Sequence, residues 1–189
     1  MNGYVADEQF EGKDYTTTGI GKGEYERCVF KNCNFSSADL SDVFFVECEF
    51  VNCDLSMANL TNTAFRTVQF TNCKMLGMRL DQCNKLLLSF SCDSCKLDFS
   101  SFFKLKLKST LFKNCSLKEV EFMEADLTQS KFPGCDFTRA NFDNTILNAA
   151  DFRTAVNYSI DPERNIVKNA RFSLTEIHGL LEKYNIRIE

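Results

Sequence analysis

The chain has 189 residues and a formal net charge of −4 at pH 7, enough for one domain with a sizeable core. No apolar run approaches the ~18 residues of a membrane span, and the first residues lack the basic and apolar regions of a signal peptide. We therefore expect a single cytoplasmic protein and exclude the membrane and secreted classes.

A large apolar residue recurs every five residues along most of the chain. The large positions in the stretch 28–45 are Phe30, Phe35, Leu40 and Phe45. The small residues two places before them are Cys28, Cys33, Ala38 and Val43. A period of five is neither the 3.6 of an α-helix nor the 2 of a β-strand.

In chain order, the repeat runs from Phe10 to Leu80, reaches Phe90, and resumes from Leu97 to Phe152. The gap of seven between Phe90 and Leu97 indicates a two-residue insertion after Phe90. A competing alignment places the insertion earlier and uses Leu87 as the large residue.

Every fourth repeat carries the same residue type. One ladder is Phe10, Phe30, Phe50, Phe70, Phe90, Phe112, Phe132 and Phe152, and another is Cys33, Cys53, Cys73, Cys95, Cys115 and Cys135. A period of 20 built from four fives predicts an all-β solenoid with four sides per coil, in which identical residues stack inside. Asn and Ser between the apolar positions suit the corners.

The repeating units identify a family resemblance. "ADLSD", "ANLTN", "ADLTQ", "ANFDN" and "ADFRT" match the A-(D/N)-(L/F)-x-x repeat, so the chain resembles the pentapeptide-repeat proteins. The resemblance covers residues 10–154 and implies a right-handed quadrilateral parallel β-helix.

Residues 155–189 form a tail outside this repeat. Ser173 and Glu176 have the spacing of a capping box, which predicts one short helix over about 174–184. Such a helix would cover the open end of the β-helix. The tail resembles that of the quinolone-resistance and microcin-immunity branch of the family, which implies a homodimer. The residues expected at that contact are Leu174, Ile177, Leu181, Tyr184, Ile186 and Ile188.

The ten cysteines do not indicate a metal or redox centre. Cys92 and Cys95 form a C-x-x-C, but there is no second such pair, and the one histidine, His178, lies in the tail. We expect the cysteines to be reduced packing residues. No nucleophile with a base and no phosphate loop is recognisable, so we expect no enzyme, cofactor or metal.

A local acidic cluster is the first candidate for function. Its residues are Glu119, Glu121, Glu124 and Asp126, with Asp143 one coil further on. In the resembled branch, an acidic rod-shaped dimer mimics duplex DNA and binds DNA gyrase or topoisomerase IV. Roughly seven coils at ~4.8 Å give ~35 Å per subunit, so a dimer spans about 20 base pairs.

Two features weaken this transfer. Residues 1–94 carry 13 acids and 8 bases, whereas residues 95–189 carry 13 acids and 14 bases, so the half with the tail is not acidic overall. The two-residue insertion is also shorter than the projecting loops of many quinolone-protecting members.

The alternative is an interaction rod with no topoisomerase role. Phe103 and Met123 are expected to stack on one outer face, where exposed apolar groups mark interaction sites. Direct nucleic-acid binding through the central lysines is disfavoured, because acids and bases mix along each side and the net charge is negative.

Overall fold

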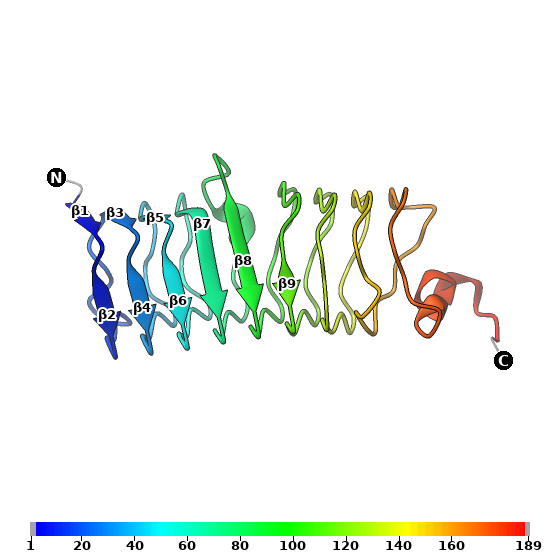
Figure 1. Ribbon diagram of the computed structural model, residues 1–189, viewed down its shortest axis with the longest axis horizontal. Coiled ribbons are helices and arrows are strands. Elements are labelled where there is room, and N and C mark those ends of the chain that lie inside the picture. Colours follow the sequence, from blue (N-terminus) through cyan, green and yellow to red (C-terminus); the bar gives the residue numbers. More distant parts are fainter. Residues whose placement is uncertain (1–2, 188–189) are drawn as a thin grey trace.

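The structure is a computed structural model that describes residues 3–187, which form an elongated parallel β-solenoid (Figure 1). The two ends of the chain lie at opposite ends of the rod. The strands are β1 Gly3–Ala6, β2 Gln9–Glu11, β3 Gly23–Glu26, β4 Val29–Lys31, β5 Phe44–Val46, β6 Glu49–Val51, β7 Ala64–Thr71, β8 Ser89–Asp93 and β9 Phe112–Lys113. The 3-10 helices are η1 Leu80–Gln82, η2 Ile177–Leu180 and η3 Glu182–Tyr184.

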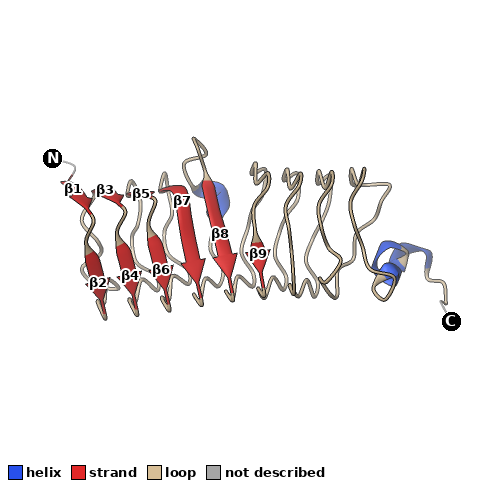
Figure 2. Ribbon diagram, viewed as in Figure 1, coloured by secondary structure: helices blue, strands red, loops and turns tan. Residues whose placement is uncertain are grey.

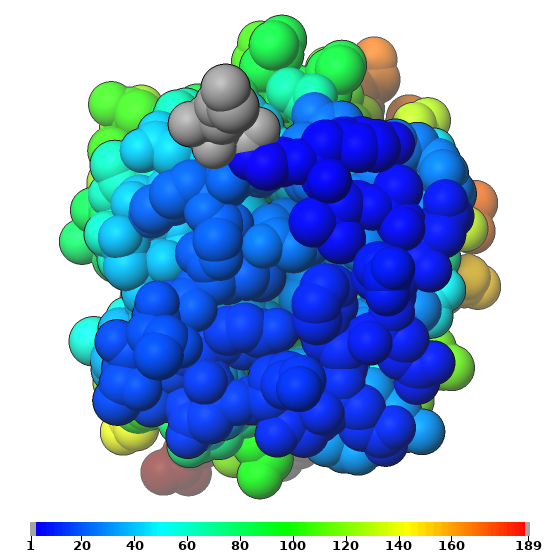
Figure 3. All heavy atoms as spheres, turned by 90° about the vertical axis from the view of Figure 1, so that its left-hand side faces the viewer, coloured from blue at the N-terminus to red at the C-terminus, as the bar shows by residue number. Residues whose placement is uncertain are grey.

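Each coil has four sides, as the period predicted, and the fold class is confirmed. Strand pairing sets Phe10 beside Phe30 and Phe30 beside Phe50, so one coil contains 20 residues. The outline seen from the N-terminal end is close to square (Figure 3). We name the sides by the coil 28–47 and by the residues stacked on it. Side I is 28–32, side II is 33–37, side III is 38–42 and side IV is 43–47.

The corners explain why the period is five. Asn32, Ser37, Asp42 and Glu47 close the four sides of one coil, and each has a positive φ between 53° and 57°, as in the left-handed region. Short polar residues such as Asn tolerate this conformation best, which accounts for the corner asparagines Asn52, Asn62 and Asn72. Each corner therefore turns the chain onto the next side after five residues.

The inside is a stack of aromatic and aliphatic side chains. Phe30 and Phe50 stack with ring centroids 4.8 Å apart, and Phe132 and Phe152 stack at 4.7 Å. The small positions close the wall and also satisfy backbone oxygens. The thiol of Cys53 donates to the carbonyl of Phe30, and the hydroxyl of Thr63 donates to that of Leu40, each 23 residues back. Cysteine is thus used here as a small apolar residue with a weak donor.

Regular strands occupy mainly the N-terminal half of the rod, yet the ladder continues beyond them (Figure 2). After β9 the coils pair through single parallel bridges, such as Glu121 with Asn141 and Asp151 with Arg171. The ladder also extends past the expected end of the repeat at residue 154. Phe172 stacks on Phe152 at 5.4 Å and adds a further rung to the phenylalanine ladder.

The two-residue insertion lies before Phe90, so its expected place after Phe90 is wrong. Cys92, not Phe90, pairs with both Phe70 and Phe112, and Phe90 pairs with Val68 in the small column. Phe90 therefore occupies the position of a small residue and Cys92 that of a large one. The total side-chain volume inside this side is unchanged by the exchange. The competing alignment had the insertion on the correct side, but Leu87 is 69% exposed. Leu88 packs against the core instead.

The tail helix is shorter than expected and is of a different type. Two 3-10 turns, η2 and η3, replace the α-helix expected over 174–184. The hydroxyl of Ser173 accepts from the backbone N–H of Glu176, as a capping box requires. The Glu176 carboxylate, however, accepts from the N–H of Asn157, and the carbonyl of Gly179 accepts from Ile160. Contacts with the last coil therefore take up groups that an α-helix would use.

Gly179 is the point where the tail meets the rod. A Cβ atom at this position would lie 2.1 Å from the carbonyl oxygen of Tyr158, so only glycine allows this approach. The tail packs against the last coil at the C-terminal end of the rod.

We predict that Phe70→Ala lowers the free energy of unfolding by ~3–5 kcal/mol, because it empties a packed aromatic site. The control, Leu87→Ala, should change it by less than ~0.5 kcal/mol, because that side chain faces water. Urea melts of both variants measure the difference. Equal losses would contradict the position of the insertion.

Candidate interaction surface

The stacked coils sort the outward charges into columns. Over residues 28–149, side III carries six carboxylates and two bases. These are Asp39, Asp42, Asp81, Glu121, Glu124 and Asp143, with Arg79 and Lys104. On the other sides the bases equal or outnumber the acids. Side III is therefore the single negative side of these coils.

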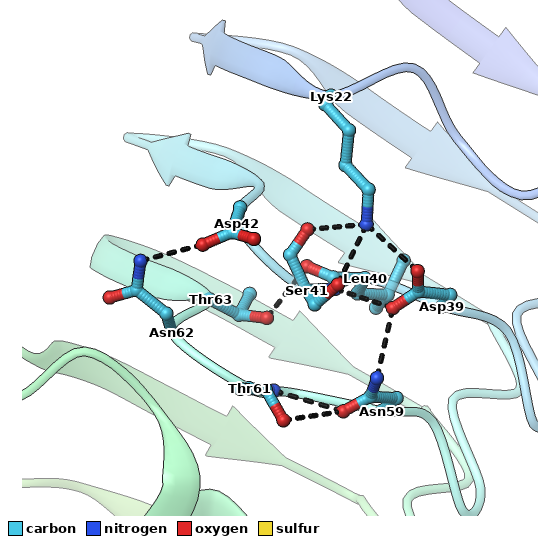
Figure 4. A network of polar contacts seen from close by, with 9 residues as sticks. All are labelled: Lys22, Asp39, Leu40, Ser41, Asp42, Asn59, Thr61, Asn62 and Thr63. Atoms are coloured by element: carbon cyan, nitrogen blue, oxygen red, sulfur yellow. Dashed lines mark hydrogen bonds and ion pairs between the residues drawn. The ribbon is translucent and has the colours of Figure 1, made fainter.

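The N-terminal part of side III is a hydrogen-bonded network (Figure 4). The Lys22 ammonium lies 2.9 Å from Asp39, and the amide of Asn59 donates to the same carboxylate from the next coil. Hydrogen bonds from Ser41 and from Lys22 lower the pKa of Asp39 to about 2. Asp42 accepts from the Asn62 amide at 2.7 Å. Both carboxylates are held in position by these hydrogen bonds, and Asp39 stays charged at neutral pH.

The acidic cluster expected from the sequence is divided among three sides. Glu121, Glu124 and Asp143 lie on side III, whereas Glu119 lies at the corner that ends side II, and Asp126 lies on side IV. The close spacing of these residues in the sequence did not reveal their separation, because successive five-residue repeats lie on different sides of the coil. The members of side III that sequence reasoning missed, Asp39, Asp42 and Asp81, become visible only when residues are sorted by the 20-residue period.

Most of the cluster is paired with bases. Glu124 lies 3.4 Å from Lys104, Asp126 lies 3.3 Å from Lys108, and Asp143 lies 2.8 Å from Arg164. Glu119 contacts Arg139 on the next coil. Glu121 accepts a hydrogen bond from the Ser101 hydroxyl at 3.1 Å. The negative charge of side III is thus partly neutralised near its C-terminal end.

The apolar candidates lie on the same side as these acids. Phe103 and Met123 are half-buried and occupy one column, which continues with Asp81 before them and Asp143 after them. The Lys104 ammonium lies 4.6 Å from the centre of the Phe103 ring. The two surfaces that the sequence offered as alternatives are therefore one surface, with an apolar centre and charged ends.

The tail presents a second apolar surface. Leu174 is 89% exposed, and Tyr184 and Ile186 are more than half exposed. Ile177 and Leu181 are half-buried and line a hollow of about 650 Å³ together with His178. Ile188, the last residue expected at a dimer contact, lies outside the described residues.

The cysteines lie inside the rod, and Cys92 and Cys95 are no exception. Burial raises the pKa of the Cys48 thiol to about 12 and raises those of Cys83 and Cys92 as well. Among residues 3–187, no group of three or more His, Cys, Asp or Glu side chains is arranged to hold a metal ion. No helix in that range is long and apolar enough to cross a membrane.

Comparisons with known proteins agree with this geometry. A family model described as "Pentapeptide repeat region" matches residues 24–102, and one described as "Pentapeptide repeats (8 copies)" matches residues 121–156. The chain belongs to the pentapeptide-repeat proteins.

Several solved structures share its fold. A trypsin-treated variant of QnrB1, a plasmid-mediated fluoroquinolone resistance protein, has 19% identity and a TM-score of 0.64, covering 99% of this chain and 100% of its own. Full-length QnrB1 has 19% identity and a TM-score of 0.57, with coverage of 97% and 100%. HetL from the cyanobacterium Nostoc, a pentapeptide-repeat protein involved in regulating heterocyst differentiation, has 17% identity and a TM-score of 0.53, with coverage of 90% and 88%. No curated protein matches the sequence of this chain.

We predict that a thiol reagent at pH 8 labels the folded protein slowly, because all ten thiols are buried in the rod and out of reach of the reagent. After unfolding, all ten cysteines should react. Fast labelling of the native protein, or a shortfall of free thiols after unfolding, would contradict the packing role.

Proposed function

We propose that this chain is a non-enzymatic DNA mimic whose side III occupies the DNA-binding surface of DNA gyrase or topoisomerase IV and so protects the enzyme from inhibitors. The observation that carries the proposal is that the negative charge is concentrated on one side of a rigid rod. A surface that binds the DNA backbone is basic, so a side that carries six carboxylates and two bases is complementary to it.

The shape of the rod supports the same idea. Successive coils rise by ~4.8 Å, and the backbone ladder fixes the three outward columns of side III, each of which carries two of the six carboxylates. Because these columns are attached to a β-solenoid, little conformational entropy is lost when they meet a partner. The network around Asp39 and Asn59 adds to this rigidity.

Phe103 and Met123 add a feature that duplex DNA lacks. Protein interfaces commonly have an apolar core inside a polar rim, and side III has that arrangement. These two residues would select one basic protein surface over others, whereas the carboxylates supply long-range attraction.

The family relatives support two readings. QnrB1 is named as a fluoroquinolone resistance protein, which favours the topoisomerase role. HetL is named for the regulation of differentiation, so the same fold serves other purposes. The second candidate function is therefore an interaction rod with no topoisomerase role, favoured by the apolar centre formed by Phe103 and Met123.

We further propose that the chain forms a homodimer through the tail. Leu174 and Ile186 expose apolar surface, and they line the same hollow as Ile177 and Leu181. A second copy of the tail would remove this surface from water. Two rods joined in this way would double the length of side III.

We predict that the purified protein changes DNA supercoiling by gyrase, as inhibition at high concentration or as rescue in the presence of a gyrase poison. The variant Asp42→Asn/Glu121→Gln/Glu124→Gln should weaken the effect at least about fivefold, because three charge contacts are lost. A matched control, Glu8→Gln/Glu47→Gln/Glu49→Gln, removes three exposed carboxylates away from side III and should retain it.

The effect should also decrease as salt rises, because salt screens exposed charges. Equal weakening by the two triple variants would contradict the assignment to side III. If the protein has no effect on gyrase or topoisomerase IV from the source organism, the interaction rod remains as the candidate function. A pull-down from that organism's lysate would then compare the unchanged chain with the variant Phe103→Ser/Met123→Ser, and so test the apolar centre.

We predict that Leu174→Ser/Ile186→Ser shifts the protein from dimer to monomer in light scattering, because both apolar contacts are removed. Leu86→Ser/Leu87→Ser is the matched control, since these leucines are also exposed but lie far from the tail in sequence. A full-length chain that is monomeric at micromolar concentration would contradict the dimer.

A further inference from the structure

Side I, opposite side III in the four-sided coil, carries a groove near the C-terminal end of the rod. One part has a volume of about 600 Å³, and a second part has about 380 Å³. Lys131 and Asp151 line both parts, so the two parts are adjacent. The other lining residues are Ser109, Leu111, Gln129, Pro133, Ala149, Arg153, Thr154 and Arg171.

The groove exists because one corner lacks a long side chain. Ala149 occupies a left-handed corner position that Gln129 occupies one coil earlier. A methyl group at this corner leaves a notch between the long side chains of Lys131 and Arg171. Leu111, which is 38% exposed, adds apolar surface to the same notch.

The charges in the groove favour an anion. Asp151 is engaged by Arg153, whose Nη2 lies 2.7 Å from Oδ2 and whose Nε lies 3.0 Å from Oδ1. Within residues 3–187, neither Lys131 nor Arg171 forms an ion pair of its own. Hydrogen bonds from Arg153 and, less strongly, the charge of Arg171 lower the pKa of Asp151, so the groove keeps an excess of positive charge although Arg171 is partly offset.

The side-chain amide of Gln129, which lines the groove, can also donate a hydrogen bond to a ligand. The hydroxyl of Ser109 donates to Oε1 of Gln129 at 3.4 Å, which leaves the amide nitrogen of Gln129 to donate to a ligand. Lys131, Asp151 and Arg171 follow one another in a single column. At ~4.8 Å per coil, the backbones of Lys131 and Arg171 are ~10 Å apart along the axis.

We propose that this groove binds an extended acidic peptide segment of a partner protein, with two carboxylate side chains on Lys131 and Arg171 and an apolar side chain over Leu111 and Ala149. Charge complementarity identifies the partner's chemistry, and the length of the column sets the separation of its carboxylates. The site lies on the side opposite to side III, and it does not depend on the proposed topoisomerase role.

A nucleic acid fits the groove less well. Binding of single strands combines a basic channel with aromatic side chains on which bases stack. In the described structure, the lining of the groove contains no aromatic residue. The net charge of −4 also repels a long polyanion.

The test is fluorescence anisotropy with the full chain and a labelled hexapeptide, Leu-Ser-Glu-Ser-Glu-Ser, whose leucine and two glutamates face the same side when it is extended. Lys131→Gln/Arg171→Gln should raise the Kd about fivefold to tenfold, because two charge-assisted contacts are lost. Lys96→Gln/Lys106→Gln, which removes two exposed cations from sides II and IV, should change it less than about twofold.

A second variant separates shape from charge. Ala149→Gln copies the residue one coil earlier at a corner of the same conformation, so it should fill the notch without disturbing the fold. It should weaken peptide binding while Lys131 and Arg171 remain. The version of the peptide with glutamine in place of both glutamates should bind more weakly than the glutamate version.

The proposal is overturned by equal binding of the two peptides, or by equal losses in the groove and control variants. It is also overturned by a short single-stranded DNA that binds more tightly than the acidic peptide, or by no peptide binding at millimolar concentration. A normal urea melt for each variant shows that a loss of binding is not a loss of folding.

Discussion

The structure depends on left-handed residues at its corners, which recur every five residues over 27–77 and over 94–149. Each of these residues turns the chain onto the next side, and four such turns return it to the start with the backbone one strand spacing higher. Each coil can then pair its N–H and C=O groups with the coils on either side, which leaves the inside free for apolar side chains. The corner asparagines are part of this constraint, because Asn accepts positive φ more easily than most residues.

The same constraint decides where charge can gather. Residues 20 apart share a column, so an acidic side is built from residues far apart in the sequence, as with Asp39 and Glu121. Neighbouring residues such as Glu124 and Asp126 are separated onto different sides. Two opposite sides of one rod thereby acquire different character, acidic with an apolar centre on side III and locally basic with a groove on side I.

The coil with the insertion shows how the core adjusts without losing its ladder. Side IV of this coil is lengthened to residues 83–89, and Leu86 and Leu87 are exposed while Leu88 packs against the core. The exchange of Phe90 and Cys92 keeps one large and one small residue inside side I. Parallel pairing on both sides of the insertion is preserved, because the register is restored by the end of β8.

The sequence by itself determined the four-sided solenoid and the inward Phe and Cys columns, because period and residue type act locally at every corner. Only the tertiary structure decided the place of the insertion, since both alignments keep the spacing on either side and differ only in which side chain finds room inside. It also decided the 3-10 form of the tail, where Gly179 and Glu176 bond to the last coil. The tertiary structure also placed Phe103 and Met123 on the same side as the acids of side III. These residues are far apart in the sequence and become neighbours only when the coils stack.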